Sequence, residues 1–428
     1  MAPVTLPVPL VGDGLLVPCV DGTERPYLSF DAATSTSALP QVMEAVEAFV
    51  PWYAGMHNGA GYKSQASALA YSSVHFGALA FAGRGPDSGD VAVICRNTTE
   101  AINHLAYRLN LDPGDVVVTT AAEHYSNLLP WMRVATCRFV ECGRDGTFEP
   151  GDVAAALDQR PVPRLLAITG ASNVTGWLPP LPEIISAAHQ RAIPVLVDAA
   201  QLAPHRPLPP EADFLAWSGH KMYAPFGTGV LVGPRRIFMA GDPLPEREEA
   251  GSPNVIGAVA LGAAISALEV IGWPAIASHD HRIARSLRHG LAAIPGVRLL
   301  GPGPGTETLP VITFMVDGVP DALVAARLAA EEAIGVRHGS FCAHPYLARL
   351  AGLSPARARI RGDQARDDGH GAGAVRISAG INASEQDVAR LLAAIARLVA
   401  SEPPVRYLRD PSTGDFYPAA SGFRAARR

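Results

Sequence analysis

Two stretches decide the interpretation of this sequence: Val195-Leu196-Val197-Asp198-Ala199-Ala200-Gln201 and, further along, Trp217-Ser218-Gly219-His220-Lys221. The first begins as an apolar run typical of a buried parallel strand, which Asp198 ends. Ligands of open α/β sheets bind at the carboxyl ends of the strands, so the Asp198 carboxylate is expected in a ligand site. Lys221 offers an amine that can hold an aldehyde cofactor, and Asp198 offers a carboxylate that can keep a pyridine nitrogen protonated. The pair predicts a pyridoxal phosphate site; the alternative is a Lys and an Asp on unrelated surface loops.

Short β-rich runs alternate with helical segments through the middle of the chain, which is the βαβ order of a mostly parallel sheet. The strand-like runs lie at residues 91–94, 116–119, 138–140, 164–168, 195–197, 214–216 and 229–232. They predict an α/β fold built on a mostly parallel, seven-stranded sheet. After Pro274 the pattern changes to a charged helix, two strands, a helix and a closing strand and helix, which favours a smaller α+β domain.

This order predicts three parts of the chain: an N-terminal arm (1–30), a large cofactor-binding domain (31–274) and a small C-terminal domain (275–428). The apolar stretch 255–271 is shorter than the ~20 residues of a membrane span, so a buried helix is expected there. The segment 351–373 is dense in Arg, Asp and Gly and is expected to form a surface loop or lid. Three histidines of the helix after Pro274 are expected on a solvated face: His279, His281 and His289.

The composition is that of an ordinary enzyme. A formal charge of −5 argues against a nucleic-acid-binding protein, which would carry a basic face. The N-terminus, Met1-Ala2-Pro3-Val4, lacks the cationic start and apolar core of a secretory signal. Five cysteines without a CxxC pair indicate free thiols in a reducing compartment. We therefore expect a cytoplasmic protein that binds neither nucleic acid nor membrane.

Polar residues that follow the predicted strands indicate where a cofactor would lie. Asn97 and Thr98 open a helical pattern, where backbone amides and hydroxyls can hold a phosphate; the alternative is a plain helix N-cap. Ser218 and His220 can close on the same phosphate from the other side. His124 follows another strand, where its imidazole can stack on the flat cofactor ring, although a lone His is usually structural.

Several short segments, in this order, carry a resemblance to a known family. They are Asn97-Thr98-Thr99-Glu100, Glu123-His124-Tyr125-Ser126-Asn127, Ser172-Asn173-Val174-Thr175-Gly176, Asp198-Ala199-Ala200-Gln201, Ser218-Gly219-His220-Lys221, Ala250-Gly251-Ser252-Pro253-Asn254 and Val336-Arg337-His338-Gly339-Ser340-Phe341-Cys342-Ala343. The chain resembles the class V (fold type I) pyridoxal phosphate enzymes from about Tyr27 to Ala400. Within them it is most similar to the group II cysteine desulfurases, which include selenocysteine lyase-like proteins.

The resemblance implies a role for each matching cofactor residue. Lys221 would hold the cofactor aldehyde, Asp198 would pair with the ring nitrogen, and Gln201 would bond the ring hydroxyl. His124 would stack on the ring. The implied phosphate ligands are Asn97, Thr98, Ser218 and His220. Ser252 would reach the phosphate of a neighbouring subunit, which implies a homodimer with shared active sites.

The resemblance also implies how a small amino acid would be bound and cleaved. Asn173, Arg376 and Arg337 would bind the substrate, a task that suits a planar guanidinium fork. Cys342 would attack the sulfur or selenium of cysteine or selenocysteine and become a persulfide, releasing alanine. A sulfur-acceptor protein is a possible partner. Such a thiol must be accessible and have thiolate character.

Other interpretations of Cys342 and of the whole site stay open. Cys342 can instead be a small buried hydrophobe, or a metal ligand with His338 and His344, although their spacing fits no standard structural zinc site and no metal is predicted. The family pattern has His directly before the active cysteine, where this chain has Phe341. A specialised C–S lyase, epimerase or aminotransferase is therefore the main alternative, because the same cofactor serves all these reactions. A catalytically silent scaffold is the third.

Overall fold

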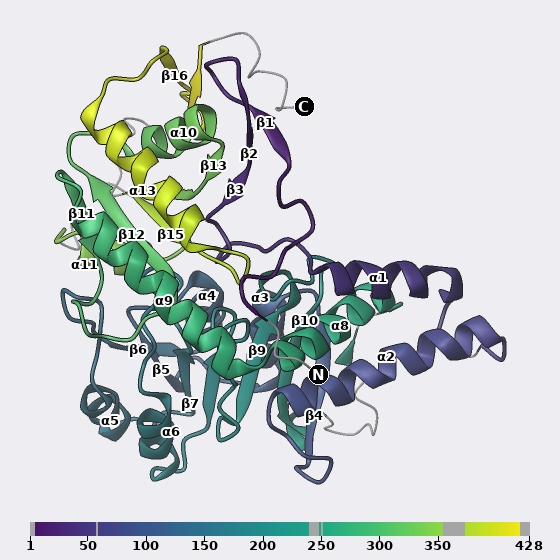
Figure 1. Cartoon of the computed structure of the whole chain (residues 1–428). Helices are drawn as coiled ribbons and strands as arrows, with labels where there is room; N and C mark the ends of the chain where they lie inside the picture. Colours follow the sequence, from purple (N-terminus) through teal and green to yellow (C-terminus); the bar gives the residue numbers. More distant parts are fainter. Residues whose placement is uncertain (1–4, 57–58, 239–247, 250, 354–372, 420–428) are drawn as a thin grey trace.

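The computed structural model describes residues 5–56, 59–238, 248–249, 251–353 and 373–419. Figure 1 shows a large sheet with its helices in the lower part of the molecule and a smaller sheet above it, with the long helix α9 (Trp273–Ala292) running between them. Most of the segment 351–373, predicted to be a loop or lid, lies outside the described residues.

The large sheet has seven strands in the order β4-β10-β9-β8-β7-β5-β6. The chain supplies β4 (Asp90–Cys95), β5 (Val116–Thr120), β6 (Thr136–Val140), β7 (Leu165–Thr169), β8 (Val195–Asp198), β9 (Phe214–Ser218) and β10 (Gly229–Pro234). Strands β6, β5, β7, β8 and β9 pair in parallel, whereas β10 is antiparallel to both of its neighbours. The predicted seven-stranded, mostly parallel α/β sheet is confirmed.

Both faces of this sheet are buried, which explains the continuous apolar runs of its strands. On β7, Leu166 and Ile168 belong to the hydrophobic core of one face, and Leu165 and Ala167 belong to the core of the other. The helices of this part are α1 (Pro40–Phe49), α2 (Tyr62–Phe81), α3 (Thr98–Arg108), α4 (Leu129–Val134), α5 (Pro150–Asp158), α6 (Leu181–His189), α7 (Arg235–Phe238) and α8 (Val255–Ile271).

The second sheet is antiparallel, with strand order β11-β12-β15-β14 and its own core. It contains β11 (Val297–Leu300), β12 (Val311–Val316), β14 (Arg337–Gly339) and β15 (Ala374–Ser378). Around it lie α10 (Asp321–Glu332), α11 (His344–Leu350) and α13 (Glu385–Ala400). The segment β3 (Leu28–Ser29) pairs in parallel with β13 (Ile334–Gly335), so the N-terminal segment is tied to this part. The domain boundaries at 30 and 274 stay predictions.

Short elements complete the described chain. Two hairpins, β1 (Leu16–Pro18) with β2 (Glu24–Pro26) and β16 (Tyr407–Arg409) with β17 (Phe416–Pro418), lie near its two ends. Three 3-10 turns occupy Val50–Trp52, Tyr125–Asn127 and Gly219–Lys221. The last two follow β5 and β9 and carry residues of the predicted site.

The prediction for the histidines of α9 was wrong at one position. His279 is 1% exposed, and its Nε2 is 2.8 Å from the carbonyl of Ala383, whereas His281 and His289 are exposed. The neighbouring Asp280 is also buried and pairs with His205 and Arg206 of the large-sheet part. The polar residues of this helix therefore divide between solvent and a buried polar cluster.

Helix α8 is mostly buried, as predicted for 255–271. No single helix of the described chain is long and apolar enough to cross a membrane; α8 and α9 reach that length and composition only as a pair bent by 81°.

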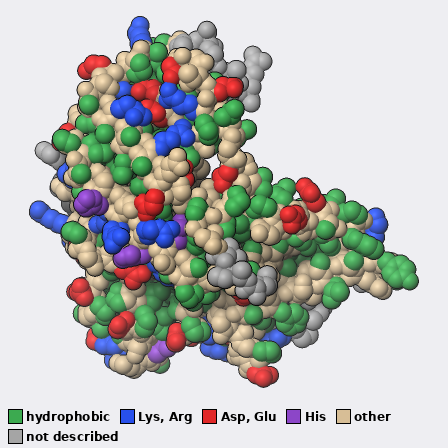
Figure 2. Space-filling model, viewed as in Figure 1, with side chains coloured by type: hydrophobic (Ala, Val, Ile, Leu, Met, Phe, Trp, Pro, Cys, Tyr) green, Lys and Arg blue, Asp and Glu red, His purple; other side chains and the backbone are tan. Residues whose placement is uncertain are grey.

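Helices α1 and α2 extend sideways from the body of the molecule as a limb (Figure 1). Figure 2 shows hydrophobic side chains over much of this limb. Tyr62, Leu69 and Phe76 of α2 are 87%, 74% and 71% exposed. Their spacing of seven residues places them on one face of the helix. Helix α2 also packs against α8, whose first turn follows Ser252.

Candidate active site

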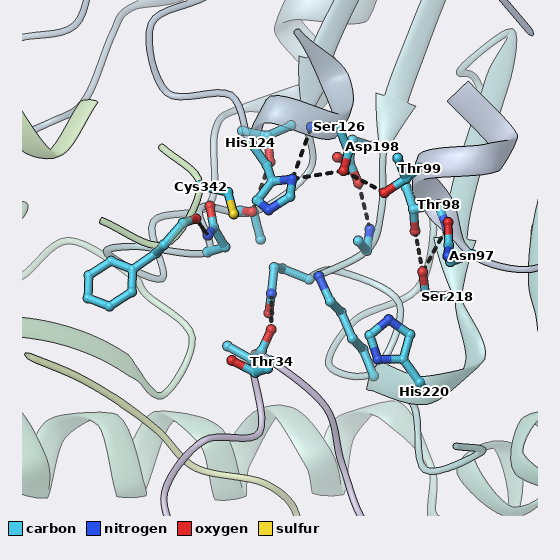
Figure 3. Close-up of a pocket in the computed structure, with 18 of the residues that line it drawn as sticks. Thr34, Asn97, Thr98, Thr99, His124, Ser126, Asp198, Ser218, His220 and Cys342 are labelled. Carbon is cyan, nitrogen blue, oxygen red and sulfur yellow. Dashed lines mark hydrogen bonds between the residues drawn. The ribbon is translucent and has the colours of Figure 1, made fainter. Parts of the chain in front are cut away.

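A cavity of about 340 Å³ opens between the two sheets' strand ends and contains all but one of the predicted site residues. These are Asn97, Thr98, His124, Asn173, Asp198, Gln201, Ser218, His220, Lys221, Arg337, Cys342 and Arg376. Figure 3 shows His124 and Cys342 on one side of this space and Asn97, Thr98 and Ser218 on the other. The exception is Ser252, which is exposed and belongs to a segment outside the cavity lining.

One end of the cavity is the N-terminus of α3, where unpaired backbone amides favour an anion. The Asn97 side chain caps this helix by accepting from the Glu100 amide at 2.9 Å. The Ser218 hydroxyl, at the end of β9, accepts from the Thr98 amide at 2.8 Å and lies 2.7 Å from the Thr98 hydroxyl. Gly229 lets β10 approach closely, because a Cβ there would lie 2.6 Å from the Asn97 Cα.

Asp198 and Lys221 lie at the carboxyl ends of β8 and β9, deep in the cavity. Among the described residues, the Asp198 side chain has one hydrogen bond, accepted from the Ala200 amide at 3.0 Å. Burial raises the pKa of this carboxyl, so it needs a positive or N–H partner to ionise. Burial lowers the pKa of Lys221, although Asp198 acts in the opposite direction, and a lower pKa favours the neutral, nucleophilic amine.

His124 is held with its ring across the cavity by the 3-10 turn after β5. The Ser126 amide donates to its Nδ1 at 3.1 Å, which leaves the remaining ring proton on Nε2. Burial, and then the nearby Lys221, lower the pKa of His124 to about 4, so the imidazole is neutral at pH 7. The Ser126 hydroxyl lies 3.0 Å from Nδ1 and 2.6 Å from the hydroxyl of Thr99, which extends this support to α3.

Glu123 is a buried carboxyl directly behind His124. It accepts from the Thr120 hydroxyl at 2.6 Å, the Asn127 side chain at 2.7 Å and the Thr169 amide at 3.0 Å. Burial raises its pKa to about 8, and the neighbouring Asp198 acts in the same direction. These contacts join the ends of β5 and β7 beneath the cavity.

The opposite end of the cavity is formed by Arg376, on β15, and its neighbours. Its Nη1 donates to the Asn173 carbonyl at 2.9 Å, and the Asn173 side chain donates to the Phe341 carbonyl at 2.9 Å. The Arg376 guanidinium also lies over the Phe341 ring, 5.1 Å from its centroid. Burial lowers the pKa of Arg376 to about 10, so it stays a cation at neutral pH.

Cys342 is the exposed one of the chain's five cysteines, all of which are free thiols. It lies in a tight loop between β14 and α11, in which Phe341 and Cys342 both have left-handed backbone conformations, with φ of 57° and 53°. The interpretation of Cys342 as a buried hydrophobe is therefore wrong. The thiol lines the same cavity as Lys221 and Arg376.

The two histidines near Cys342 have other contacts. His338 lies between Asp321 (3.5 Å) and Asp415 (3.3 Å), which raises its pKa, and the His344 ring stacks on Tyr125. Within the described ranges, no three His, Cys, Asp or Glu side chains come together as a metal site.

Sequence reasoning missed several residues around the cavity: Thr34, Thr99, Ser126, Thr169 and Phe341 in its lining and Asp31 behind it. Thr99 and Ser126 lie close to predicted residues, in segments quoted for the family resemblance. Their position just after a predicted strand was the signal that could have identified them. Thr34 and Asp31 belong to the N-terminal segment, which reaches the site only because it pairs with the second sheet.

Most of the chain is similar to known proteins. The family model for aminotransferase class V matches residues 28–391. A cysteine desulfurase of Dickeya dadantii is 33% identical over 81% of this chain and 90% of its own length. A probable cysteine desulfurase of Halalkalibacterium halodurans is 33% identical over 79% of this chain and 89% of its own.

Two solved structures of cysteine desulfurases are also similar to this chain. The apo structure of a cysteine desulfurase from Thermococcus onnurineus matches with a TM-score of 0.77 and 28% identity, over 87% of this chain and 95% of that one. The cysteine desulfurase CsdA of Escherichia coli matches with a TM-score of 0.73, at the same identity and coverage. The protein is therefore a member of the aminotransferase class V family and is similar over most of its length to cysteine desulfurases.

Proposed function

We propose that this protein is a pyridoxal phosphate-dependent cysteine desulfurase, which removes sulfur, or selenium, from cysteine or selenocysteine and releases alanine. One observation carries the proposal: the exposed Cys342 thiol lines the same cavity as the buried amine of Lys221 and the guanidinium of Arg376. The similarity to named cysteine desulfurases supports the same reaction.

The residues of the cavity fit pyridoxal phosphate. The α3 N-terminus with Thr98, Ser218 and His220 would hold the phosphate, and Gly229 lets β10 pack closely on the Asn97 backbone at this end. Asp198, a buried carboxyl with a single hydrogen bond, would pair with the ring nitrogen. When bound, the group supplies an aldehyde for Lys221 and a ring that stabilises negative charge on the substrate carbon.

The protein's own residues would then bind and orient the amino acid. Arg376 is a buried cation, and the Asn173 side chain is fixed by the Phe341 carbonyl, so both can position the substrate carboxylate. Lys221, whose pKa burial lowers, can accept and return a proton at the substrate α-carbon. Neutral His124 can donate from Nε2.

Cys342 would perform the sulfur transfer. Its thiolate attacks the sulfur of the substrate, an S–S bond forms, and the C–S bond breaks with its electron pair passing to the substrate carbon. That carbon takes a proton to become the methyl group of alanine, and Cys342 keeps the sulfur as a persulfide. An exposed persulfide can be attacked by the thiol of an acceptor, which we propose to be a small thiol or a carrier protein.

The test is to incubate the purified holoenzyme with cysteine and to measure alanine by chromatography and the persulfide by mass spectrometry of the Cys342 peptide. The Cys342→Ser variant is compared with Cys137→Ser, because Cys137 is partly buried on β6 and lies outside the cavity lining. We expect stoichiometric persulfide on Cys342, alanine turnover in Cys137→Ser and at least a hundredfold loss in Cys342→Ser.

Full turnover by Cys342→Ser would contradict the desulfurase. Absorbance of a bound cofactor without alanine or persulfide would instead favour the lyase, epimerase or aminotransferase alternative, whose products should then be sought. Absence of cofactor absorbance in purified protein would revive the silent scaffold.

We also propose that the protein is a homodimer with shared active sites. The exposed apolar face of α2 (Tyr62, Leu69 and Phe76) suits a large interface, and single soluble chains rarely leave such faces open. Helix α2 packs on α8, which follows Ser252, so an interface there would bring Ser252 close to a second copy.

Light scattering after size-exclusion chromatography tests this. We expect a dimer for the native chain and a monomer for Leu69→Asp combined with Phe76→Asp. Tyr107→Asp is the control, because Tyr107 is 76% exposed on α3, on a different helix. A native monomer at micromolar concentration, or an unchanged dimer in the double variant, would rule out this interface.

A cytoplasmic location is likewise proposed from the five free thiols and is tested by fractionation of the source cells.

A further inference from the structure

A second set of contacts surrounds Arg376 and involves a carboxylate. Arg376 Nη2 lies 3.2 Å from Asp31 Oδ1, and Arg337 Nη2 lies 2.8 Å from Asp31 Oδ2. Each oxygen of Asp31 therefore faces one guanidinium. Asp31 lies just before Thr34, and Thr34, Arg337 and Arg376 all line the cavity.

The Thr34 hydroxyl completes this network. It donates to Asp31 at 2.8 Å and accepts from Arg376 Nη2 at 2.7 Å and from Arg337 Nε at 3.1 Å. One donated and two accepted bonds use its full capacity. Thr34 therefore fixes the geometry of the two guanidinium groups without changing their charge.

Arg376 still has donors for a ligand, because its guanidinium carries five N–H groups. Its Nη1 is bound to the Asn173 carbonyl and its Nη2 to Asp31 and Thr34. Its Nε is buried and has no hydrogen-bond partner within the part of the chain that the structure describes. A buried donor without a partner is costly, which is an argument for a ligand acceptor at this position.

The net charge at this end of the cavity determines how many negative charges a bound ligand can carry. Arg376 and Arg337 contribute two positive charges, and Asp31 removes one. One net positive charge matches the single carboxylate of an amino acid with a neutral side chain. A ligand with a second anionic group would bring two negative charges to an end of the cavity where these three side chains together leave one positive charge.

We propose that Asp31 is a specificity-determining residue, which neutralises one of the two arginines so that the site prefers a monocarboxylate over a ligand with two anionic groups. The proposal deepens the proposed function and rests on it only in taking an amino acid as the substrate. Asp31 acts through Arg337 and Arg376 and is a positioning residue, not a catalytic one.

The experiment measures binding without turnover. Propionate and succinate are titrated into the purified holoenzyme by calorimetry, and the ratio of their dissociation constants is compared between variants. Asp31→Asn keeps an oxygen acceptor but removes the charge. Thr34→Val is the matched control, because it removes a hydroxyl from the same network and leaves all charges in place.

We expect Asp31→Asn to shift the ratio about tenfold towards succinate, as one uncompensated charge at this range would. Thr34→Val should leave the ratio unchanged while weakening both ligands. An unchanged ratio in Asp31→Asn, or an equal shift in Thr34→Val, overturns the proposal.

A second variant tests the proposal in case Asp31→Asn folds poorly. Arg337→Gln removes a cation and should shift the ratio the opposite way, towards propionate; no shift, or a shift towards succinate, also overturns the proposal. Thermal unfolding of each variant checks that it folds. Because no reaction is followed, a protein that binds these anions as expected but makes no alanine contradicts the proposed function alone.

Discussion

The backbone amide of Tyr125 donates a 2.9 Å hydrogen bond to the carbonyl of Cys342. It joins the turn after β5 of the large sheet to the loop after β14 of the small one. Both partners are backbone groups, so changing the thiol does not remove the bond. Loss of activity on substituting Cys342 would therefore report chemistry and not a displaced loop.

The Asn173 side chain also holds the loop that carries Cys342, which gives a first prediction. Asn173→Ala removes the bond from its Nδ2 to the Phe341 carbonyl, worth about 1 kcal/mol. We expect alkylation of Cys342 by iodoacetamide to become about fivefold faster in the variant, because the loop opens more often. Asn382→Ala is the control, because its side chain pairs with Asp13 at an exposed site. An equal rate in wild type and Asn173→Ala would mean that Asn173 does not restrain the loop.

The chain has only two lysines, Lys63 and Lys221, which gives a second prediction. Borohydride treatment of the holoenzyme should fix the cofactor to Lys221 alone, seen as a mass increase on the peptide that contains it. Lys221 is deep in the cavity, whereas Lys63 is exposed on α2. Lys63→Ala should keep the full label and Lys221→Ala should lose it. Label that persists in Lys221→Ala would contradict the assigned role.

Strand β10 supports a third prediction, because two of its glycines are crowded by different neighbours. A Cβ at Gly229 would lie 2.6 Å from the Asn97 backbone, and a Cβ at Gly233 would lie 2.5 Å from the Phe214 ring. Both Ala variants should lower the melting temperature by several degrees through overpacking. Only Gly229→Ala should also weaken cofactor binding, by about tenfold or more, since Asn97 opens the helix at the end proposed for the phosphate.

Equilibrium dialysis against pyridoxal phosphate separates these effects. Equal cofactor affinity in the two variants would mean that the approach of β10 to Asn97 has no part in binding.

The strands of the large sheet were predictable because both faces are buried. A buried parallel strand is a continuous apolar run, and β7, β8 and β9 follow that rule closely. Most site residues were predictable for a related reason, since they follow directly after such runs. Their chemical roles stay predictions.

Asp31 and Thr34 were missed because their place at the site depends on contacts that no local pattern carries. Asp31 and Arg376 are 345 positions apart, and their ion pair forms only because the N-terminal segment lies along β15. His279 was misplaced because its helix is rich in charge, whereas its ring reaches the Ala383 carbonyl far along the chain. Ser252 does not line the cavity of its own chain, and the family resemblance implies a role for it only at the neighbouring subunit, so that role depends on the proposed dimer.

The buried carboxyl of Glu123 gives the last prediction. Its pKa is raised from its ordinary value near 4.5 to about 8, chiefly by burial. Between these values the folded state holds a proton that the unfolded state has released. Stability therefore falls as pH rises through this window, by up to about 1.4 kcal/mol per pH unit for one proton. Glu123→Gln removes the titration and keeps one oxygen acceptor for the Thr120 hydroxyl and the Thr169 amide, which bind the same Glu123 oxygen.

Urea unfolding of both proteins at pH 5, 6, 7 and 8 measures this dependence. We expect the wild-type free energy of unfolding to decrease with pH relative to the variant, with the largest difference at pH 8. Glu149→Gln is the control, because Glu149 is exposed and caps α5. Parallel pH curves for wild type and Glu123→Gln would mean that Glu123 is ionised in the folded protein, held by its three hydrogen bonds.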